Sequence, residues 1–412
     1  MLRLVRSELL PPRQRARAKS RRSTPGNGGT SSMRDVGGPS RPLRFIACAM
    51  LLGAALWAQN LSREGSDWVL TLNGTLPAAA RLRVNAQGPV LVQGGNGREI
   101  SYTAKLSVRA RSEEEARRVL SQYSIPVAAG GDTVLINPPG GTVMEHLTIK
   151  TPRQTAAYIN TSDGDVEADG LDGPLQVNSV GGALKCDRIR GDCSLNTGGG
   201  NIQVGEVNGE LRCATAGGSI NVKNAGRSVV LQTGGGEIEL GEAGGMVRAE
   251  TVGGSIRISS AGGAVTATTG GGPIQVGKAG GVVTARNVAG FVQIGAAAGV
   301  LCESGSGGVR VSNIAGPMRV STTVGNIVAS LLGGSTFRDS FIETANGDIT
   351  VMIPSNLGVT IMAQAQRRIV SDFNSVGVRM QGPEFIAEGQ INGGGPVLRI
   401  SGTGGTISLK RQ

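Results

Sequence analysis

The stretch 233-TGGGEIELGEAGGMVRAET-251 carries the pattern that decides the fold of this chain. Ile238 and Leu240 stand two residues apart after a glycine run, and nine residues later Val247 and Ala249 repeat that spacing. Alternation of apolar and polar residues with period two indicates short β-strands with one buried face. Glycine ends each strand, and we expect it to permit a tight corner with positive φ.

The nine-residue spacing runs far beyond this stretch. Steps of nine from Gly164 to position 308 give seventeen positions, of which sixteen are glycine, the exception being Arg227. A second period of eighteen is carried by Thr161, Ser179, Thr197, Thr215, Thr233, Thr251 and Thr269. The repeating unit is therefore a coil of two strands, and stacked coils pair residue i with residue i+18 in parallel. The lattice loses one residue near Gly299 and resumes four residues late at 344–351.

These periods predict an all-β chain built around a parallel β-solenoid of two-stranded, 18-residue coils, about nine in number. Residues 1–58 are assigned to a basic leader and signal peptide, 59–160 to a small α+β cap, 161–353 to the solenoid and 354–412 to a C-terminal β cap. The one helix expected begins at a capping box formed by Ser112 and Glu115. One ladder of buried side chains is expected from Ile202, Ile220, Ile238, Ile256 and Ile274.

The net charge of +11 resides mostly in the leader. Residues 1–45 hold eleven basic and two acidic residues, a net of +9, so the remaining 30 basic and 28 acidic residues leave the body at +2. A body so close to neutral lacks the basic surface of a nucleic-acid binder.

Phe45–Ala58 is a run of 14 apolar residues that is preceded by arginines and ends in alanine. This pattern is typical of a secretory signal peptide and predicts an extracytoplasmic protein (periplasm, outer surface or secreted) with cleavage after Ala58. A leader retained as an anchor and a start at Met33 in place of Met1 stay open as alternatives.

No residue is assigned a catalytic, cofactor-binding or metal-binding role. His146 is the only histidine, which excludes sites that need two. Cys186, Cys193, Cys213 and Cys302 lack C-x-x-C spacing and are interpreted as small core residues, with a disulfide between Cys186 and Cys193 left open.

Calcium is not expected in the solenoid. Calcium-binding β-rolls need an aspartate in each nonapeptide, and this chain has none between Asp192 and Asp339. The acidic entry segment, with Asp163, Asp165, Glu167, Asp169 and Asp172, is interpreted as a solvated first coil in preference to an ion site.

A polysaccharide lyase or hydrolase would need carboxylates close together on the surface, and one outward row of side chains is where they would be expected. The row reads Glu167, Lys185, Gln203, Asn221, Glu239, Arg257, Gln275, Gln293 and Arg310. Glu167 and Glu239 are four coils apart, about 19 Å at the spacing of strands, which is too far for two carboxylates to cooperate. Glu237 and Glu239 are the one close outward pair, so a mixed, solvated face is the preferred interpretation.

The repeated Gly-x-[Ile/Val]-x-[Val/Ala]-x-Thr-x-x-Gly-Gly units, the run Gly347–Pro354, and the later segments Val370–Phe373, Gly393–Pro396 and Ile407–Leu409 resemble the bacterial "putative adhesin" β-strand-repeat family. That family is a group of uncharacterised secreted or envelope proteins. The resemblance covers about residues 60–412. It implies the solenoid architecture and suggests, through the family name alone, a role in adhesion.

The sequence thus predicts a non-enzymatic, secreted or cell-envelope protein with a structural or adhesive, surface-binding role and no cofactor. The expected partner is a surface ligand, either a polysaccharide or another envelope protein, with no nucleic acid. Two alternatives are carried forward: the polysaccharide lyase or hydrolase, and an envelope scaffold that polymerises by self-association at the ends of the rod.

Overall fold

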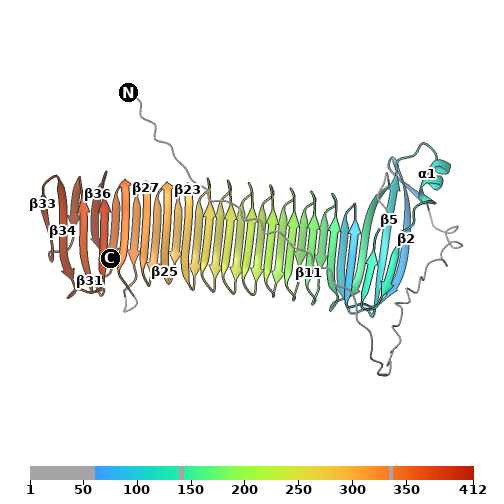
Figure 1. The fold of residues 1–412 in the computed structure, drawn as a ribbon, viewed down its shortest axis with the longest axis horizontal. Helices are drawn as coiled ribbons and strands as arrows, with labels where there is room; N and C mark the ends of the chain where they lie inside the picture. The colour runs from blue at the N-terminus through green and yellow to red at the C-terminus, as the bar shows by residue number, and fades with distance from the viewer. Residues whose placement is uncertain (1–60, 139–142, 334–336) are drawn as a thin grey trace, which may run out of the picture. The chain divides into compact units, whose positions relative to one another are not determined.

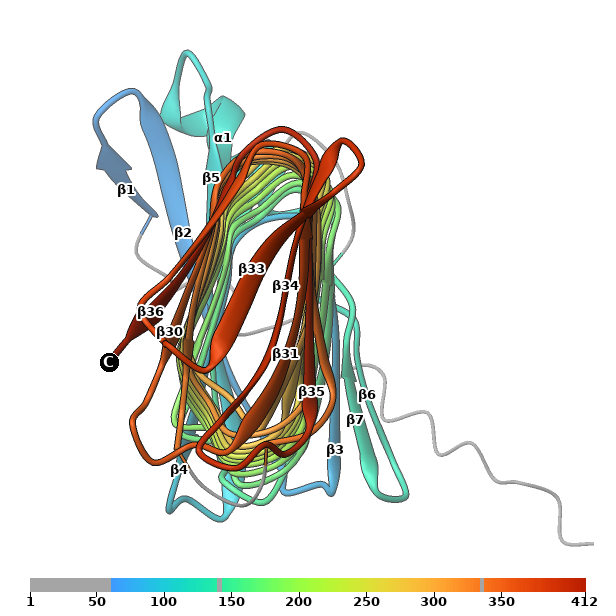
Figure 2. The same ribbon diagram turned by 90° about the vertical axis from the view of Figure 1, so that its left-hand side faces the viewer.

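The computed structural model describes residues 61–138, 143–333 and 337–412, all within one compact unit. These residues form a parallel β-solenoid of about eleven turns, which we call the rod (Figure 1). Each turn contributes one strand to each of two sheets, A and B, and the view along the rod shows the turns superimposed as flattened coils (Figure 2). The predicted fold class is confirmed, with about two turns more than the nine expected.

The strands of the central rod alternate between the two sheets. Those of sheet A are β10 (Val166–Asp169), β12 (Leu184–Asp187), β14 (Ile202–Val207), β16 (Ile220–Ala225), β18 (Ile238–Ala243), β20 (Ile256–Ala261), β22 (Ile274–Ala279), β24 (Val292–Ala296), β26 (Val309–Ile314), β28 (Ile327–Leu331) and β30 (Ile349–Ile353). Those of sheet B are β9 (Ala156–Thr161), β11 (Leu175–Ser179), β13 (Cys193–Thr197), β15 (Leu211–Thr215), β17 (Val229–Thr233), β19 (Val247–Thr251), β21 (Val265–Thr269), β23 (Val282–Ala289), β25 (Gly299–Ser306), β27 (Met318–Val324) and β29 (Ser340–Asn346).

Pairing between coils is parallel and follows the predicted register. Ile238 of β18 lies beside Ile220 and Ile256, and the whole isoleucine ladder is at most 1% exposed. The step shortens to seventeen residues between Val283 and Val300, and lengthens to twenty-two between Val320 and Ile342. Both shifts lie where the glycine lattice slips, so the lattice sets the register.

The glycines of the nine-residue lattice are required because the backbones of successive coils lie very close together. The expectation that they are required for a positive φ is wrong. A Cβ atom on Gly236 would lie 2.0 Å from the carbonyl oxygen of Gly218, and one on Gly254 would lie 1.9 Å from that of Gly236. The φ angles of these glycines lie outside the left-handed region, which the lattice enters only from Gly290 onward. Glycine is therefore needed because the backbones of successive coils touch at this corner.

The residues that recur every eighteen positions join these corners through buried hydroxyl groups. Thr233 Oγ1 donates to the carbonyl of Gly218 at 2.8 Å and accepts the N–H of Gly236 at 3.2 Å. The same two bonds recur in the coils of Thr197, Thr215, Thr251 and Thr269. Each hydroxyl therefore satisfies one backbone carbonyl and one backbone N–H at the corner.

In the N-terminal cap, the first coil of the chain lies between strands that come later in the sequence. Its elements are β1 (Leu61–Glu64), β2 (Asp67–Pro77), β3 (Arg81–Ala86), β4 (Val90–Gly95), β5 (Glu99–Val108), α1 (Glu113–Leu120), β6 (Val127–Gly130), β7 (Thr133–Ile136) and β8 (Met144–Pro152). The coil of β3 and β4 pairs in parallel with β9 and β10 on one side and with β7 and β8 on the other. Parallel pairing thus begins before residue 161.

The helix α1 begins where the capping box predicts. Ser112 Oγ accepts the N–H of Glu115 at 3.3 Å, and Glu115 Oε2 accepts the N–H of Arg111 at 3.0 Å. Ala116 and Leu120 are buried against the cap. Because only this face is apolar, the helix is stabilised mainly by its contact with the sheet.

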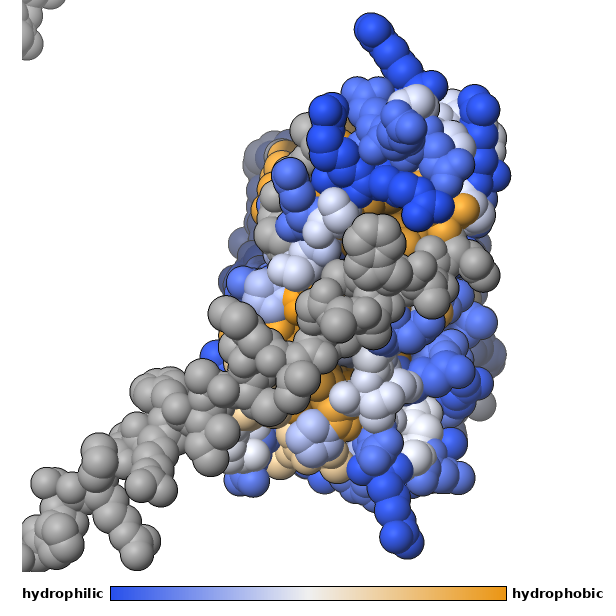
Figure 3. All heavy atoms as spheres, turned by 90° about the vertical axis from the view of Figure 1, so that its right-hand side faces the viewer, coloured by the Kyte–Doolittle hydropathy of each residue, from blue (hydrophilic) through white to orange (hydrophobic). Residues whose placement is uncertain are grey.

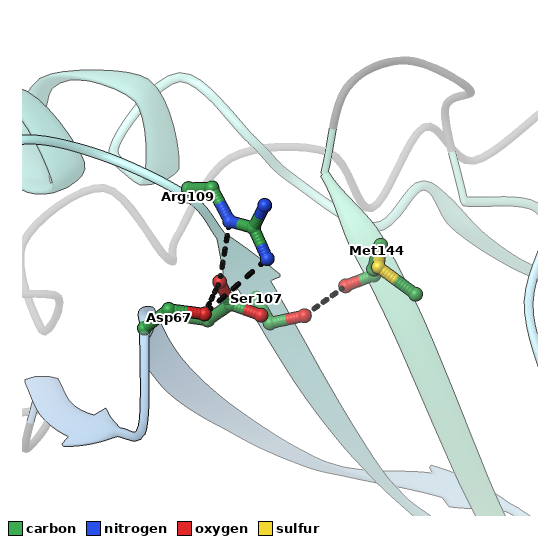
Figure 4. A network of polar contacts seen from close by, with 5 residues as sticks. Asp67, Ser107, Arg109 and Met144 are labelled. Carbon is green, nitrogen blue, oxygen red and sulfur yellow. Dashed lines mark hydrogen bonds and ion pairs between the residues drawn. The ribbon is translucent and has the colours of Figure 1, made fainter.

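Polar contacts fasten the outer strands of the cap. Arg109 after β5 reaches Asp67 at 3.3 Å and Ser66 at 3.3 Å, and Ser107 Oγ donates to the carbonyl of Met144 at 3.5 Å (Figure 4). Seen from this end, the described surface is mostly hydrophilic, with hydrophobic residues confined to small areas (Figure 3). This surface suits the end of a solenoid that remains in water.

The C-terminal cap places the last coil inside the stack. Its strands are β31 (Val359–Ala365), β32 (Arg368–Ser371), β33 (Val376–Gln381), β34 (Glu384–Ile391), β35 (Val397–Gly402) and β36 (Thr406–Arg411). Strand β35 lies between β29 and β31, and β36 lies between β30 and β32. The antiparallel hairpin of β33 and β34, which the sequence analysis missed, crosses the end of the rod (Figure 2).

Candidate functional site

The outer face of sheet A carries the predicted row of side chains, in the predicted register. Neighbours in the row bind one another: Lys185 pairs with Glu167 at 2.8 Å, and Asn221 donates to Glu239 at 2.8 Å. Glu237, which precedes β18, is exposed. The row is a solvated surface on which six of the nine polar side chains pair with a neighbour along the rod.

Three of the five acidic side chains in the entry segment form ion pairs with basic residues of the next coil. Glu167 pairs with Lys185, Asp169 with Arg188, and Asp172 with Arg190 at 3.4 Å. Asp165 Oδ1 accepts the N–H of Ala183 at 2.7 Å. In the part of the chain that the structure describes, no group of three or more His, Cys, Asp or Glu side chains is arranged to hold a metal ion.

The outer face of sheet B begins with a ladder of amide side chains. Asn196 donates to Asn178 at 3.2 Å, Asn178 to Asn160 at 3.0 Å, Asn160 to Asn85 at 3.0 Å, and Asn85 to Asn137 at 3.1 Å. The three inner amides, those of Asn85, Asn160 and Asn178, both donate and accept, so the ladder has no unpaired member in its middle. In sequence, Asn160, Asn178 and Asn196 share the period of eighteen, a signal that could have identified the ladder.

An open hollow of about 590 Å³ lies where this ladder stops. Ala214 takes the next position in the row, and its short side chain leaves space between Asn196 and Gln232. Gln232 is held by Glu250 at 2.9 Å. The hydroxyls of the lining threonines of the corner are occupied by their backbone bonds, so the amides of Asn196 and Gln232 are the groups that offer donors and acceptors to a ligand rich in hydroxyl groups.

A second hollow of about 430 Å³ lies on the same face near the C-terminal cap. Leu301, Arg319, Phe341 and Arg399 stand side by side on β25, β27, β29 and β35 and line it. The guanidinium of Arg319 lies 5.5 Å from the centre of the Phe341 ring. The sequence could not reveal this group, because Arg399 reaches Phe341 only when β35 inserts beside β29.

The four cysteines of the rod are buried free thiols. Cys186 and Cys193 face each other across one coil with their sulfur atoms 3.7 Å apart. Their hydrogen bond and burial raise the pKa of Cys186, and burial raises that of Cys302 to about 12. Thiols with a raised pKa are poor nucleophiles, so neither Cys186 nor Cys302 has the character of a catalytic residue.

One carboxyl group is buried in the N-terminal cap. Glu145 is 4% exposed, and Tyr123 Oη donates to its Oε2 at 2.8 Å. Burial raises the pKa of Glu145, and burial together with the contact to Glu145 raises the pKa of Tyr123. His146, the next residue, is exposed and faces away from this pair.

The predicted leader and signal peptide, residues 1–58, lie outside the described residues. Among the residues that are described, no helix is long and apolar enough to cross a membrane.

Comparison with known proteins finds similar chains among solved structures. No family model and no curated protein matches. An adhesin-like structure from Bacteroides fragilis, described as a "putative adhesin", is 11% identical, with 84% of this chain and 97% of that chain covered at a TM-score of 0.25. A "putative adhesin" from Parabacteroides distasonis is 12% identical, with 69% and 96% covered at a TM-score of 0.28. A "putative cell adhesion protein" from Clostridium sporogenes is 10% identical, with 83% and 100% covered at a TM-score of 0.17.

All three descriptions agree with the family resemblance seen in the sequence. Identities this low and TM-scores below 0.5 say nothing about the ligand of this chain.

Proposed function

We propose that this chain is a non-enzymatic, extracytoplasmic protein that binds a surface polysaccharide through the outer face of sheet B. The observation that carries the proposal is the pair of open hollows on this one face, which lie along parallel strands. Parallel strands repeat their side chains about every 4.8 Å along the rod. A face of this kind suits an extended polymer with a regular repeat better than a small molecule that needs enclosure.

The experiment is co-sedimentation of the purified chain with insoluble polysaccharide fractions of bacterial envelopes. Ala214→Gln fills the first hollow without adding charge, and Thr266→Gln introduces the same side chain on this face outside the lining of both hollows. We expect Ala214→Gln to weaken binding and Thr266→Gln to leave it unchanged. Equal binding by both variants would exclude the first hollow as a contact with the polysaccharide, and release of soluble fragments by the wild-type chain would favour the lyase or hydrolase.

Export is the second part of the proposal. We expect the mature chain to begin at Gln59, as determined by N-terminal sequencing of protein recovered from outside the cytoplasm. Leu51→Arg interrupts the apolar run and should keep the chain in the cytoplasm. An N-terminus that begins at Met1 or Met33 on exported protein would contradict cleavage after Ala58.

Self-association is a second candidate function, favoured by the edge of sheet B at the C-terminal end. Among the described strands β33 pairs only with β34, and Val378 and Met380 on it are 42% and 66% exposed. An exposed edge strand is a template for pairing with another chain. Sedimentation velocity over a range of concentrations tests this, and Val378→Lys should abolish any concentration-dependent growth.

A further inference from the structure

We propose that Arg319, Phe341 and Arg399 form a binding site for an acidic polysaccharide that lies along the rod and presents repeated carboxylate groups. The inference rests on the polysaccharide-binding role proposed above, and it identifies the place on sheet B and the chemical class of the ligand.

The three side chains lie on consecutive strands of one face. Arg319 of β27 pairs in register with Phe341 of β29, which pairs in register with Arg399 of β35. Both arginines are exposed, Phe341 is half-buried, and all three line the hollow of about 430 Å³. The ring of Phe341 holds the guanidinium of Arg319 by a cation–π contact at 5.5 Å, which reduces the side-chain entropy lost when an anion binds.

These arginines differ from Arg212, Arg248 and Arg286 on the same face in having no acidic partner, a property that they share with Arg83, which lies over the ring of Tyr158. Arg212 reaches Glu210 at 3.7 Å, Arg248 reaches Glu250 at 2.5 Å, and Arg286 reaches Glu303 at 3.0 Å. Within the described residues, no carboxylate forms an ion pair with Arg319 or Arg399. Their guanidinium groups are therefore free to bind an anion.

One carboxylate does line the hollow. Asp339 Oδ1 accepts the backbone N–H of Val397 at 2.8 Å, so this group is occupied in joining β35 to its neighbour. The two arginines still leave the lining with a net positive charge.

The spacing of the two arginines favours a polymer over a single small anion. Their strands are two spacings apart, about 9.6 Å, and the Phe341 strand lies between them. Guanidinium groups bind carboxylates through paired N–H donors, so each arginine suits its own carboxylate. A polyuronate carries one carboxylate on each sugar and can supply both. A nucleic acid is less suited, since it needs a longer run of cations than a body with a net charge of +2 offers.

The test measures binding of an oligogalacturonate to the full chain by isothermal titration calorimetry. Arg319→Gln and Arg399→Gln are compared with Arg248→Gln, which removes an arginine of the same face that already has a partner. We expect each of the first two to weaken binding by about tenfold and Arg248→Gln to leave it unchanged. The methyl-esterified oligomer, which lacks the charges, should bind at least about tenfold more weakly than the free acid.

Each contrary outcome overturns the inference in a recognisable way. Equal affinity of all three variants would exclude the site. If the wild-type chain binds single-stranded DNA or polyglutamate as tightly as it binds oligogalacturonate, an acidic polysaccharide is excluded as the specific ligand class. If the wild-type chain binds envelope polysaccharide but no oligogalacturonate, this inference fails and the proposed function stands. If the wild-type chain binds neither, both fail. Unchanged thermal unfolding of the variants shows that lost binding does not reflect lost folding.

Discussion

The neighbouring glycines Gly235 and Gly236 allow a direct test of why the lattice needs glycine. Both belong to one run of three glycines, and neither has a φ in the left-handed region. A Cβ on Gly236 would lie 2.0 Å from the carbonyl oxygen of Gly218 and 2.4 Å from its carbonyl carbon. A Cβ on Gly235 would have no neighbour nearer than the oxygen of Gly217, at 4.0 Å.

The two alanine substitutions should therefore change stability in opposite directions. Since contacts below 3.0 Å essentially do not occur, Gly236→Ala must move two coils apart by about 1 Å, at a cost of about 1–3 kcal/mol. Gly235→Ala meets open space and should stabilise the chain by about 0.4–1 kcal/mol, because alanine restricts the unfolded state. The free energies of unfolding of the two variants should differ by about 1.4–4 kcal/mol.

Urea denaturation followed by far-ultraviolet circular dichroism measures this difference, with the wild-type chain as the reference. A stack of coils can unfold in parts, which would change the dependence of the unfolding free energy on urea concentration. The midpoints of the urea transitions are therefore compared only between variants for which this dependence is equal. If Gly235→Ala is as destabilising as Gly236→Ala, the glycines are required for their backbone freedom and the argument from close approach is refuted.

Four further predictions concern the core, the corner, the cap and metal ions. Ile238→Ala should lower the free energy of unfolding by about 2–5 kcal/mol in the same urea assay, and a loss below about 1 kcal/mol would contradict a packed ladder. Thr233→Val leaves the N–H of Gly236 and the carbonyl of Gly218 unpaired, and it should lower stability by about 1–3 kcal/mol. Because burial raises the pKa of Glu145, its contribution is fully present below about pH 4.3 and is lost as the pH rises through the folded pKa. Glu145→Gln should therefore gain stability relative to the wild type between about pH 4 and pH 8, and a constant difference would argue against it. Removal of divalent cations with EDTA should leave the circular dichroism of the rod unchanged, and loss of the β signal would reveal a bound ion that the sequence does not predict.

Local repetition made most of the rod predictable. A strand in a solenoid has the same neighbours in every coil, so periods of nine and eighteen specify corners, register and buried ladders together. The shifts at Val283 and Val320 follow from one residue lost and four gained in the lattice. The prediction that the lattice glycines are needed for a positive φ was wrong. It considered the backbone of a single residue, whereas the glycine is required by a contact between two coils, that of Gly236 with Gly218.

The ends of the rod and the candidate site depended on contacts between segments far apart in sequence. No period predicts that β35 inserts between β29 and β31, because the 58-residue step that pairs Phe341 with Arg399, and Ile349 with Ile407, belongs to this one coil. The hairpin of β33 and β34 is local, and Gly382 marks its turn with a φ of 62°, but it belongs to no repeat, so the periods did not predict it. The amino-acid sequence determined on its own what recurs from coil to coil, and only the tertiary structure decided which unrepeated side chains meet on the outer face of sheet B.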